Sequence, residues 1–118
     1  MEYMVIGHTK KFTWDYSAQS DILNIHKTGK IVKGSTELGD FTVDFDEDGT
    51  ILGLEIMNVS DFLQEAGISH DDLTNLQSAE LSVTSGRGDV HYIWIKLMLP
   101  MNVEKIIPIP APVLAEAA

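Results

Sequence analysis

Apolar and polar positions alternate over residues 12–16, FTWDY, and this two-residue period predicts a half-buried β-strand. The alternation stops at residues 17–21, SAQSD, which favour a turn, and apolar residues resume over 22–25. We therefore expect two strands with a short connection. Residues 26–40 mix lysine, glycine and threonine, and they predict a loop or a poorly covered edge segment.

Residues 41–57 predict a β-hairpin. Its turn is placed at Asp48-Gly49, a dipeptide favoured in two-residue turns because both positions need positive φ. This register pairs three sets of apolar residues on one face: Phe45 with Leu52, Val43 with Leu54, and Phe41 with Ile56. The other face then carries Thr42, Asp44 and Asp46 opposite Ile51, Gly53 and Glu55. A slip by one residue would destroy this segregation, so pattern and turn chemistry agree.

Two short helices are expected in the middle of the chain, near residues 60–66 and 70–76. Ser60 is the expected N-cap of the first helix and Gly67 its end. Its expected buried stripe consists of Phe62, Leu63 and Ala66. Ser69 and Asp72 resemble a capping box at the start of the second helix, although such boxes prefer Glu or Gln at the last position.

The C-terminal third predicts a second hairpin, with its turn at Arg87-Gly88. That register sets Val83 opposite Tyr92 and Leu81 opposite Trp94. The strand over residues 90–99 is also apolar on its other face, through Ile93, Ile95, Leu97 and Leu99. Such a strand is either central in the fold or placed at a subunit interface, and for so small a chain we expect a homodimer interface. Prolines 108, 110 and 112 confine the last extended segment to an edge or an irregular tail.

These elements predict one α+β domain over residues 1–118, built mostly of antiparallel β-hairpins with two short central helices. Residues 12–63 form its hairpin core and first helix, and residues 78–110 add the C-terminal hairpin. No run of residues approaches the ~20 apolar residues that a membrane helix needs. The start of the chain lacks the features of a secretory signal, so the cytoplasm is the expected location, with no membrane partner.

Composition and charge exclude several classes of function. The chain has no cysteine, which removes disulfides, thiolate metal sites and cysteine nucleophiles. Its formal net charge is −10, and residues 35–72 contain eleven acidic residues and no lysine or arginine. A surface of this kind repels phosphates, so we expect no nucleic-acid partner. A basic protein is a more natural complement.

Asp44 to Glu55, DFDEDGTILGLE, matches a twelve-residue calcium loop. The matching residues are Asp44, Asp46, Asp48, Gly49, Ile51 and Glu55. In the predicted hairpin, however, Glu55 lies four residues along the strand from the turn, roughly 13 Å from Asp48 at ~3.3 Å per residue. We therefore interpret the match as accidental. Weak binding of a divalent ion by Asp44, Asp46 and Asp48 stays open.

Other candidate chemistries have little support. His8, His26, His70 and His91 lie on separate segments without a metal-binding spacing. The chain has no GxSxG elbow and no phosphate-binding glycine loop. The triplet Arg87-Gly88-Asp89 is interpreted as a hairpin turn rather than an adhesion motif. We assign no catalytic, cofactor-binding or metal-binding residue and expect no cofactor.

Two segments resemble a prokaryotic family, the domain of unknown function 2283. Residues 16–26, YSAQSDILNIH, are similar to its Tyr-Asp-x-x-x-Asp-x-Leu-Tyr-Ile opening, with Ser17 in place of Asp and Asn24 in place of Tyr. Residues 41–63 are similar to its V-D-Y-D-x-D-G-x-x-x-G-I-E-I-x-x-A segment. The resemblance covers about residues 12–63. It implies that the aspartates, glycines and Glu55 belong to a hairpin signature, and it implies no activity.

From the sequence we hypothesise a non-enzymatic, homodimeric interaction module whose acidic central surface binds a basic protein. The alternative is a weak divalent-metal-binding or hydrolytic protein that uses Asp44, Asp46, Asp48 or Glu55.

Overall fold

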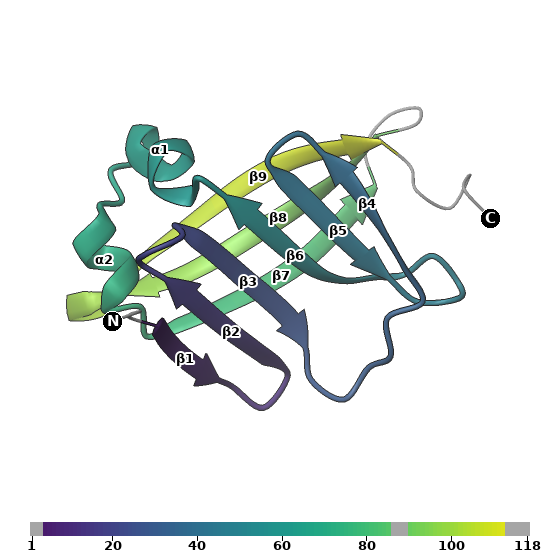
Figure 1. Cartoon of the computed structure of the whole chain (residues 1–118), viewed down its shortest axis with the longest axis horizontal. Coiled ribbons are helices and arrows are strands. Elements are labelled where there is room, and N and C mark those ends of the chain that lie inside the picture. The colour runs from purple at the N-terminus through teal and green to yellow at the C-terminus, as the bar shows by residue number, and fades with distance from the viewer. Residues whose placement is uncertain (1–3, 86–89, 113–118) are drawn as a thin grey trace.

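The computed structural model describes residues 4–85 and 90–112, which form nine strands in two antiparallel sheets (Figure 1). The first sheet has the order β1-β2-β3-β6-β5-β4, and the second has the order β7-β8-β9. The strands are β1 (Met4–His8), β2 (Phe12–Ser17), β3 (Ile22–Lys27), β4 (Gly34–Leu38), β5 (Phe41–Phe45), β6 (Ile51–Met57), β7 (Ser78–Ser85), β8 (Val90–Leu99) and β9 (Val103–Pro112). The expected mostly antiparallel fold is confirmed.

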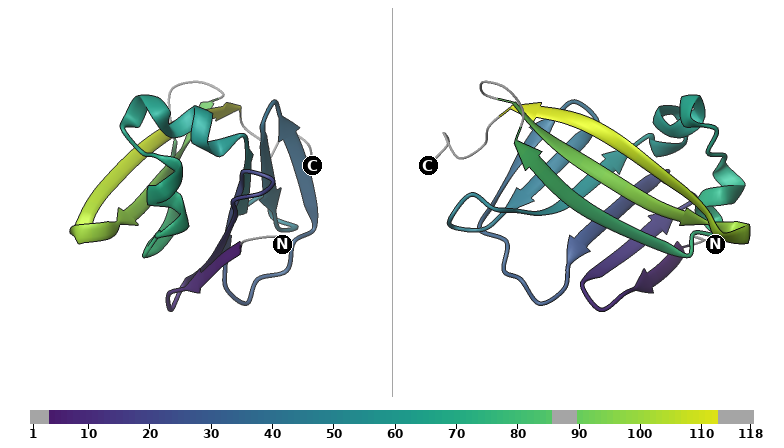
Figure 2. Two further views of the ribbon diagram at one scale, coloured as in Figure 1. Left: turned by 60° about the vertical axis from the view of Figure 1, so that its left-hand side comes forward. Right: turned by 180° about the vertical axis from the view of Figure 1, so that it is seen from behind.

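The two sheets lie face to face as layers, with the strands of the second running across those of the first (Figures 1 and 2). Strand β7 contacts β2 and β3 across the gap between the layers. The core between them consists of apolar side chains from both sheets, and burying each contributes about 1.5–3 kcal/mol. Its fully buried members include Tyr16, Leu23, Ile25, Val43, Leu54, Ile56, Ala79, Ile93, Ile95 and Leu97.

Strands β2 and β3 are the two strands that the alternation predicts. The segment over residues 26–40 contains a loop and then β4, which is the edge strand beside β5. Strand β1 forms the other edge, paired with β2, and the pattern did not predict it.

The predicted two-residue turn at Asp48-Gly49 is wrong. Asp46 closes a longer loop, because its amide donates to the Thr50 carbonyl while its carboxylate accepts from the Asp48 and Thr50 amides. Gly49 takes the left-handed conformation, φ 81°, and donates to the Asp46 carbonyl, as in three-residue hairpin loops. Phe45 consequently faces Ile51 instead of Leu52.

Beyond this loop the predicted register of β5 and β6 is confirmed. Four cross-strand pairs agree with the prediction, namely Phe41 with Ile56, Thr42 with Glu55, Val43 with Leu54, and Asp44 with Gly53. A β-bulge between Asp44 and Phe45 absorbs the difference at the turn.

The predicted register of the second hairpin is wrong by one residue. Val83 pairs with Ile93 and Leu81 with Ile95, and not with Tyr92 and Trp94. The isoleucines take the buried face, while Trp94 lies on the outer face and donates through Nε1 to Thr84 Oγ1 at 2.8 Å. The expected turn at Arg87-Gly88 lies within residues 86–89, outside the described residues.

Strand β8 is the central strand of its sheet, and its Ile93–Leu99 side is buried inside the chain. The interface that we expected on this side is therefore occupied by the six-stranded sheet of the same chain. Strand β9 is an edge strand, as its prolines predict. Pro108, Pro110 and Pro112 occupy alternate positions, so their missing amide donors all fall on one side of the strand.

Short helices follow β6 and cover one end of the sandwich (Figure 2). They are α1 (Val59–Leu63), the 3-10 helix η1 (Gln64–Ala66) and α2 (His70–Thr74), and a further 3-10 helix, η2 (Pro100–Asn102), joins β8 to β9. The capping box of Ser69 and Asp72 is confirmed, and Gly67 ends η1 with φ 77°. No helix among the described residues is long and apolar enough to span a membrane.

Two details of α1 differ from the prediction. Its N-cap is Asn58 and not Ser60, because the Ser60 side chain is engaged by Asp21. Val59 and Leu63 are buried, whereas Phe62 is 36% exposed and lies edge-on against Phe41.

Candidate functional site

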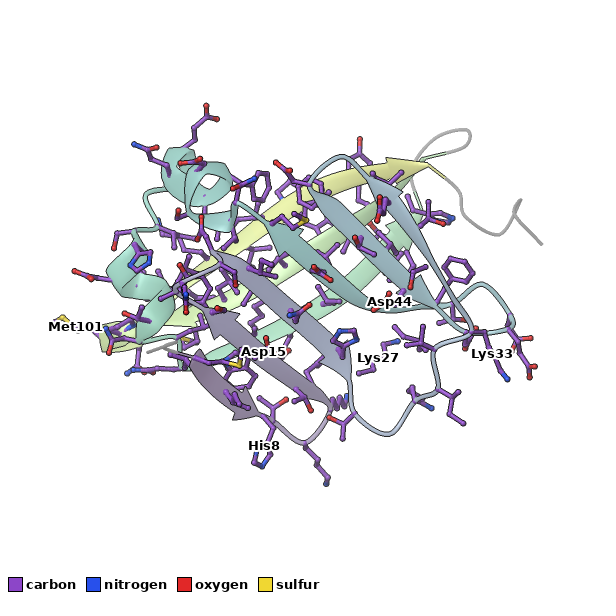
Figure 3. All side chains as sticks on the ribbon, viewed as in Figure 1. His8, Asp15, Lys27, Lys33, Asp44 and Met101 are labelled. Carbon is purple, nitrogen blue, oxygen red and sulfur yellow. The ribbon has the colours of Figure 1, made fainter. Side chains whose placement is uncertain are left out.

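The outer face of the six-stranded sheet, which points away from the second sheet, carries polar side chains in two cross-strand rows. Figure 3 labels one member of each row, Asp15 and Asp44. Successive side chains of a strand point to opposite faces of the sheet. The apolar residues point into the core, so the residues between them form rows on the outer face. The first row contains Asp15, Asn24, Glu55, Thr42 and Glu37, and the second contains Thr13, His26, Gly53, Asp44 and Ser35.

His26 and Asp44 meet over Gly53 at the centre of this face. His26 pairs with Gly53 on one side and Asp44 pairs with it on the other, so two side chains from β3 and β5 span the bare strand between them. The His26 Nδ1 atom lies 3.5 Å from Asp44 Oδ2, and Ser35 Oγ donates to Asp44 Oδ1. A Cβ atom at position 53 would lie 2.3 Å from His26 Nδ1, so only glycine permits this contact.

The first row is arranged around Asn24, whose amide donates to Asp15 Oδ1 at 3.0 Å. Asn24 separates Asp15 from Glu55, its neighbour on the other side. With Glu37 and Asp44, the outer face presents four carboxylates. The two rows contain no lysine or arginine in the described sheet, so the face has a negative potential.

The four acids of the metal-binding or hydrolytic alternative are dispersed. Asp44 contacts His26 and Ser35, while Glu55 stands beside Asn24 and Thr42. The Asp46 carboxylate accepts from its own loop, and Asp48 is exposed in that loop. Within residues 4–85 and 90–112, no three His, Asp or Glu side chains form a group that could hold a metal ion. The arrangement gives this alternative no geometric support.

The histidines also lie apart. His8 ends β1 at the margin of the outer face, His70 lies in α2 edge-on to Tyr16, and His91 lies on β8 beside a cavity at the end of the sandwich that the helices leave open. Only His26 reaches the centre of the outer face. The Arg87-Gly88-Asp89 triplet lies outside the described residues.

A second polar cluster links the turn between β2 and β3 to the start of α1. The fully buried Tyr16 hydroxyl donates to Asp21 Oδ1 at 2.9 Å. The Asp21 carboxylate also accepts from the Ser60 amide and, at 2.7 Å, from the Ser60 hydroxyl. Asp21 therefore supplies the capping interaction that Asn58 does not make through its side chain. This cluster has a structural role, because its hydrogen bonds join the β2–β3 turn to the first helix.

Burial, aided by the hydrogen bond and the charge of Asp21, raises the pKa of Tyr16 above its ordinary value. The folded chain thus keeps the phenol protonated at a pH where the unfolded chain ionises it, above about pH 10. We expect the free energy of unfolding to fall as the pH rises from about 9 to about 11, and to fall less steeply in Tyr16→Phe. Denaturant titrations at each pH measure both slopes, and equal slopes would contradict the assignment.

Substituting Gly53 tests the geometry at the centre of the outer face. Gly53→Ala forces the His26 ring away from Asp44, and we expect a loss of about 1–2 kcal/mol of unfolding free energy. The same substitution in a His26→Ala background should cost less than about 0.5 kcal/mol, because the space is then free. Equal costs in the two backgrounds, measured by denaturant unfolding, would show that His26 does not lie over Gly53.

Comparison with known proteins finds a matching family and a relative of this chain. Residues 14–60 match the model of a family described as "Protein of unknown function (DUF2283)". An uncharacterized protein of Methanocaldococcus jannaschii, MJ0789, is 34% identical over 93 residues, which cover 79% of this chain and 78% of that protein. The chain belongs to the DUF2283 family. No solved structure matches the chain significantly.

The residues that resemble the DUF2283 signature lie at three places in the structure. Tyr16 and Asp21 hold the start of α1. Asp46, Asp48 and Gly49 build the hairpin loop. Asp44, Gly53 and Glu55 lie on the outer face. Of the two departures from the signature, Ser17 is buried and accepts from Ser20, and Asn24 binds Asp15.

Sequence reasoning missed several residues of the outer face, among them Asp15, Asn24, Glu37 and, at the centre, His26. The position of His26 in the alternation of β3 marks it as outward-facing, but its significance depends on the pairing of β3 with β6. That pairing joins segments about thirty residues apart, and the pattern along the chain carries no signal for it.

Proposed function

We propose that this DUF2283 member is a non-enzymatic cytoplasmic interaction module whose outer face binds a lysine- or arginine-rich segment of a partner protein. The observation that carries the proposal is the set of four carboxylates, Asp15, Glu37, Asp44 and Glu55, on a sheet face whose described rows hold no lysine or arginine. Long basic side chains can reach such a flat face without a cleft.

The expected affinity is moderate and depends on salt. Each exposed ion pair contributes about 0.2–1 kcal/mol, so four pairs give a few kcal/mol in addition to apolar contacts. Charges at the surface are screened beyond about 8 Å at physiological ionic strength. Complementary charge mainly determines partner choice and the rate of association, which suits a module that recognises a class of basic segments.

A matched pair of variants tests whether the outer face or merely the net charge attracts a basic ligand. The outer-face variant is Asp15→Asn/Asp44→Asn/Glu55→Gln, and the control is Asp61→Asn/Glu65→Gln/Asp71→Asn, on the helices. Each removes three negative charges from a formal net charge of −10. We expect the outer-face variant to bind an octalysine peptide about tenfold more weakly than wild type, and the control within about twofold.

Calorimetric titration at about 150 mM salt provides the measurement. Equal weakening in the two variants would mean that only net charge matters and would overturn the proposal. Thermal melts of each variant confirm that both remain folded.

We further propose that the module forms a homodimer through the outer face of the three-stranded sheet (Figure 2, right). Trp94 and Lys96 of β8 pair there with Pro108 and Ile106 of β9. Ile106 is 56% exposed and Tyr92 is 38% exposed, so an apolar strip faces solvent. A second copy would cover this strip, because exposed apolar area of this kind favours association.

Sedimentation velocity tests the dimer. We expect wild type to be dimeric at tens of micromolar, Ile106→Lys to be monomeric, and Val103→Lys to remain dimeric, since Val103 is exposed at the end of the same strand. A monomeric wild type would contradict the proposal.

A further inference from the structure

The end of the sandwich that the helices do not cover contains a cavity of about 360 Å³ between the two sheets. Its walls come from the β5–β6 loop, from β7, and from the ends of β3 and β8. The lining residues that matter here are Lys27, Thr50, Ile51, Leu81, Val83 and His91. Its volume lies within the range of about 300–1,000 Å³ typical of small-molecule sites, which also combine an apolar wall with a few polar groups.

His91 contributes to the inner wall of the cavity. In the register of β8, His91 lies on the same side as Ile93 and Ile95, which places it on the inward side of the sheet. Its Nδ1 atom is buried and has no hydrogen-bond partner among the described residues. Because that atom is closed off from solvent, the ring of His91 is part of the cavity wall, and the cavity combines this ring and the Lys27 ammonium with its apolar lining.

Lys27 connects the cavity to a second hollow of about 330 Å³, which is lined by Lys10, Lys11, Phe12, Lys27, Thr28 and Lys30. Among the described residues none of these lysines forms an ion pair; the lysine that does is Lys96, with Glu104. Lys30 also borders a depression with Asp46 and Asp48, so Lys10, Lys11 and Lys27 are the cations available. The chain as a whole has a net charge of −10, so these lysines create a local region of positive potential on an otherwise acidic protein.

We propose that this end of the molecule binds a small organic anion. The apolar part of the ligand enters the cavity between Ile51, Leu81 and Val83. Its anionic group lies at the mouth against the Lys27 ammonium, with Lys10 and Lys11 beside it. This site lies away from the acidic rows of the outer face, so it stands independently of the protein partner proposed above.

Two dyes with nearly the same aromatic body test the proposal. 8-Anilinonaphthalene-1-sulfonate carries a negative charge, whereas N-phenyl-1-naphthylamine is neutral, and both fluoresce when they enter an apolar site. We expect one saturable sulfonate site per chain, occupied at least about fivefold more tightly than by the neutral dye. Lys27→Gln should abolish this preference, and Val83→Trp, which fills the cavity, should weaken both dyes.

The control variant is Lys105→Gln, on β9 near Gly67 at the end of the sandwich that the helices cover, and it should leave both affinities within about twofold of wild type. Three results would overturn the proposal: no saturable binding of the sulfonate, equal affinity of wild type for the two dyes, or equal weakening by Lys27→Gln and Lys105→Gln.

Discussion

Asp21→Ala will lower the free energy of unfolding by about 2–4 kcal/mol. The substitution removes the acceptor of the fully buried Tyr16 hydroxyl and the acceptor for the Ser60 amide and hydroxyl at the start of α1. An unpaired buried hydroxyl costs about 1–3 kcal/mol, and a lost helix cap costs about 0.5–2 kcal/mol. Asp21 also has φ 58°, a left-handed conformation that alanine tolerates less well than aspartate.

A double-mutant cycle separates these contributions in denaturant unfolding. Tyr16→Phe removes the hydroxyl that Asp21 accepts from, so the double variant Tyr16→Phe/Asp21→Ala should lose less than the sum of the single losses. Asp61→Ala, which removes an exposed carboxylate from the same helix, should cost less than about 1 kcal/mol. Strict additivity, or an Asp21→Ala loss no larger than that of Asp61→Ala, would contradict the structural role given to this cluster.

Gly7→Ala will have the second large effect, a loss of about 2–3 kcal/mol. Gly7 pairs with Trp14, and a Cβ atom at position 7 would lie 2.2 Å from Cζ2 of the Trp14 ring. The ring is only 4% exposed, and its Nε1 atom has no hydrogen-bond partner among the described residues, so packing alone holds it in place. Either the ring or β1 must move.

Denaturant unfolding and Trp fluorescence together measure this effect, because a displaced indole meets water and its emission shifts to the red. Gly29→Ala is the control: a Cβ atom there meets nothing within 4 Å, although φ is 76°, and the expected loss is about 1 kcal/mol. If Gly7→Ala cost no more than Gly29→Ala, the close packing of Trp14 on β1 would be refuted.

Local pattern predicted much of this fold, and its errors have specific causes. The alternation of β2, β3, β5 and β6 identified the strands because each strand has one face on the core. The β5–β6 loop was wrong because the Asp46 side chain accepts two backbone amides and so favours a longer loop than Asp48-Gly49 suggests. The predicted β7–β8 register was wrong because both faces of β8 are apolar: one carries Tyr92 and Trp94, and the other carries Ile93 and Ile95. Only packing against the first sheet decides which face is buried.

The candidate site was predictable only in part. The hairpin register placed Asp44 and Glu55 on the face opposite the core, as the structure confirms. The contribution of β3 to that face, through Asn24 and His26, required the pairing of β3 with β6. The role of Ser60 was missed for the same reason, since its partner Asp21 lies thirty-nine residues earlier in the chain. Contacts of this range leave no trace in local periodicity.

Whether the outer face binds basic segments is tested by locating a bound basic peptide on the folded protein. Titration of isotopically labelled protein with octalysine, followed through its amide nitrogen–proton correlation spectrum, reports where binding occurs. We expect the largest shifts on the outer face, at Asp15, Asn24, Asp44, Gly53 and Glu55. Largest shifts on the helices at Asp61, Glu65 and Asp71, or shifts spread evenly over all acidic residues, would contradict it.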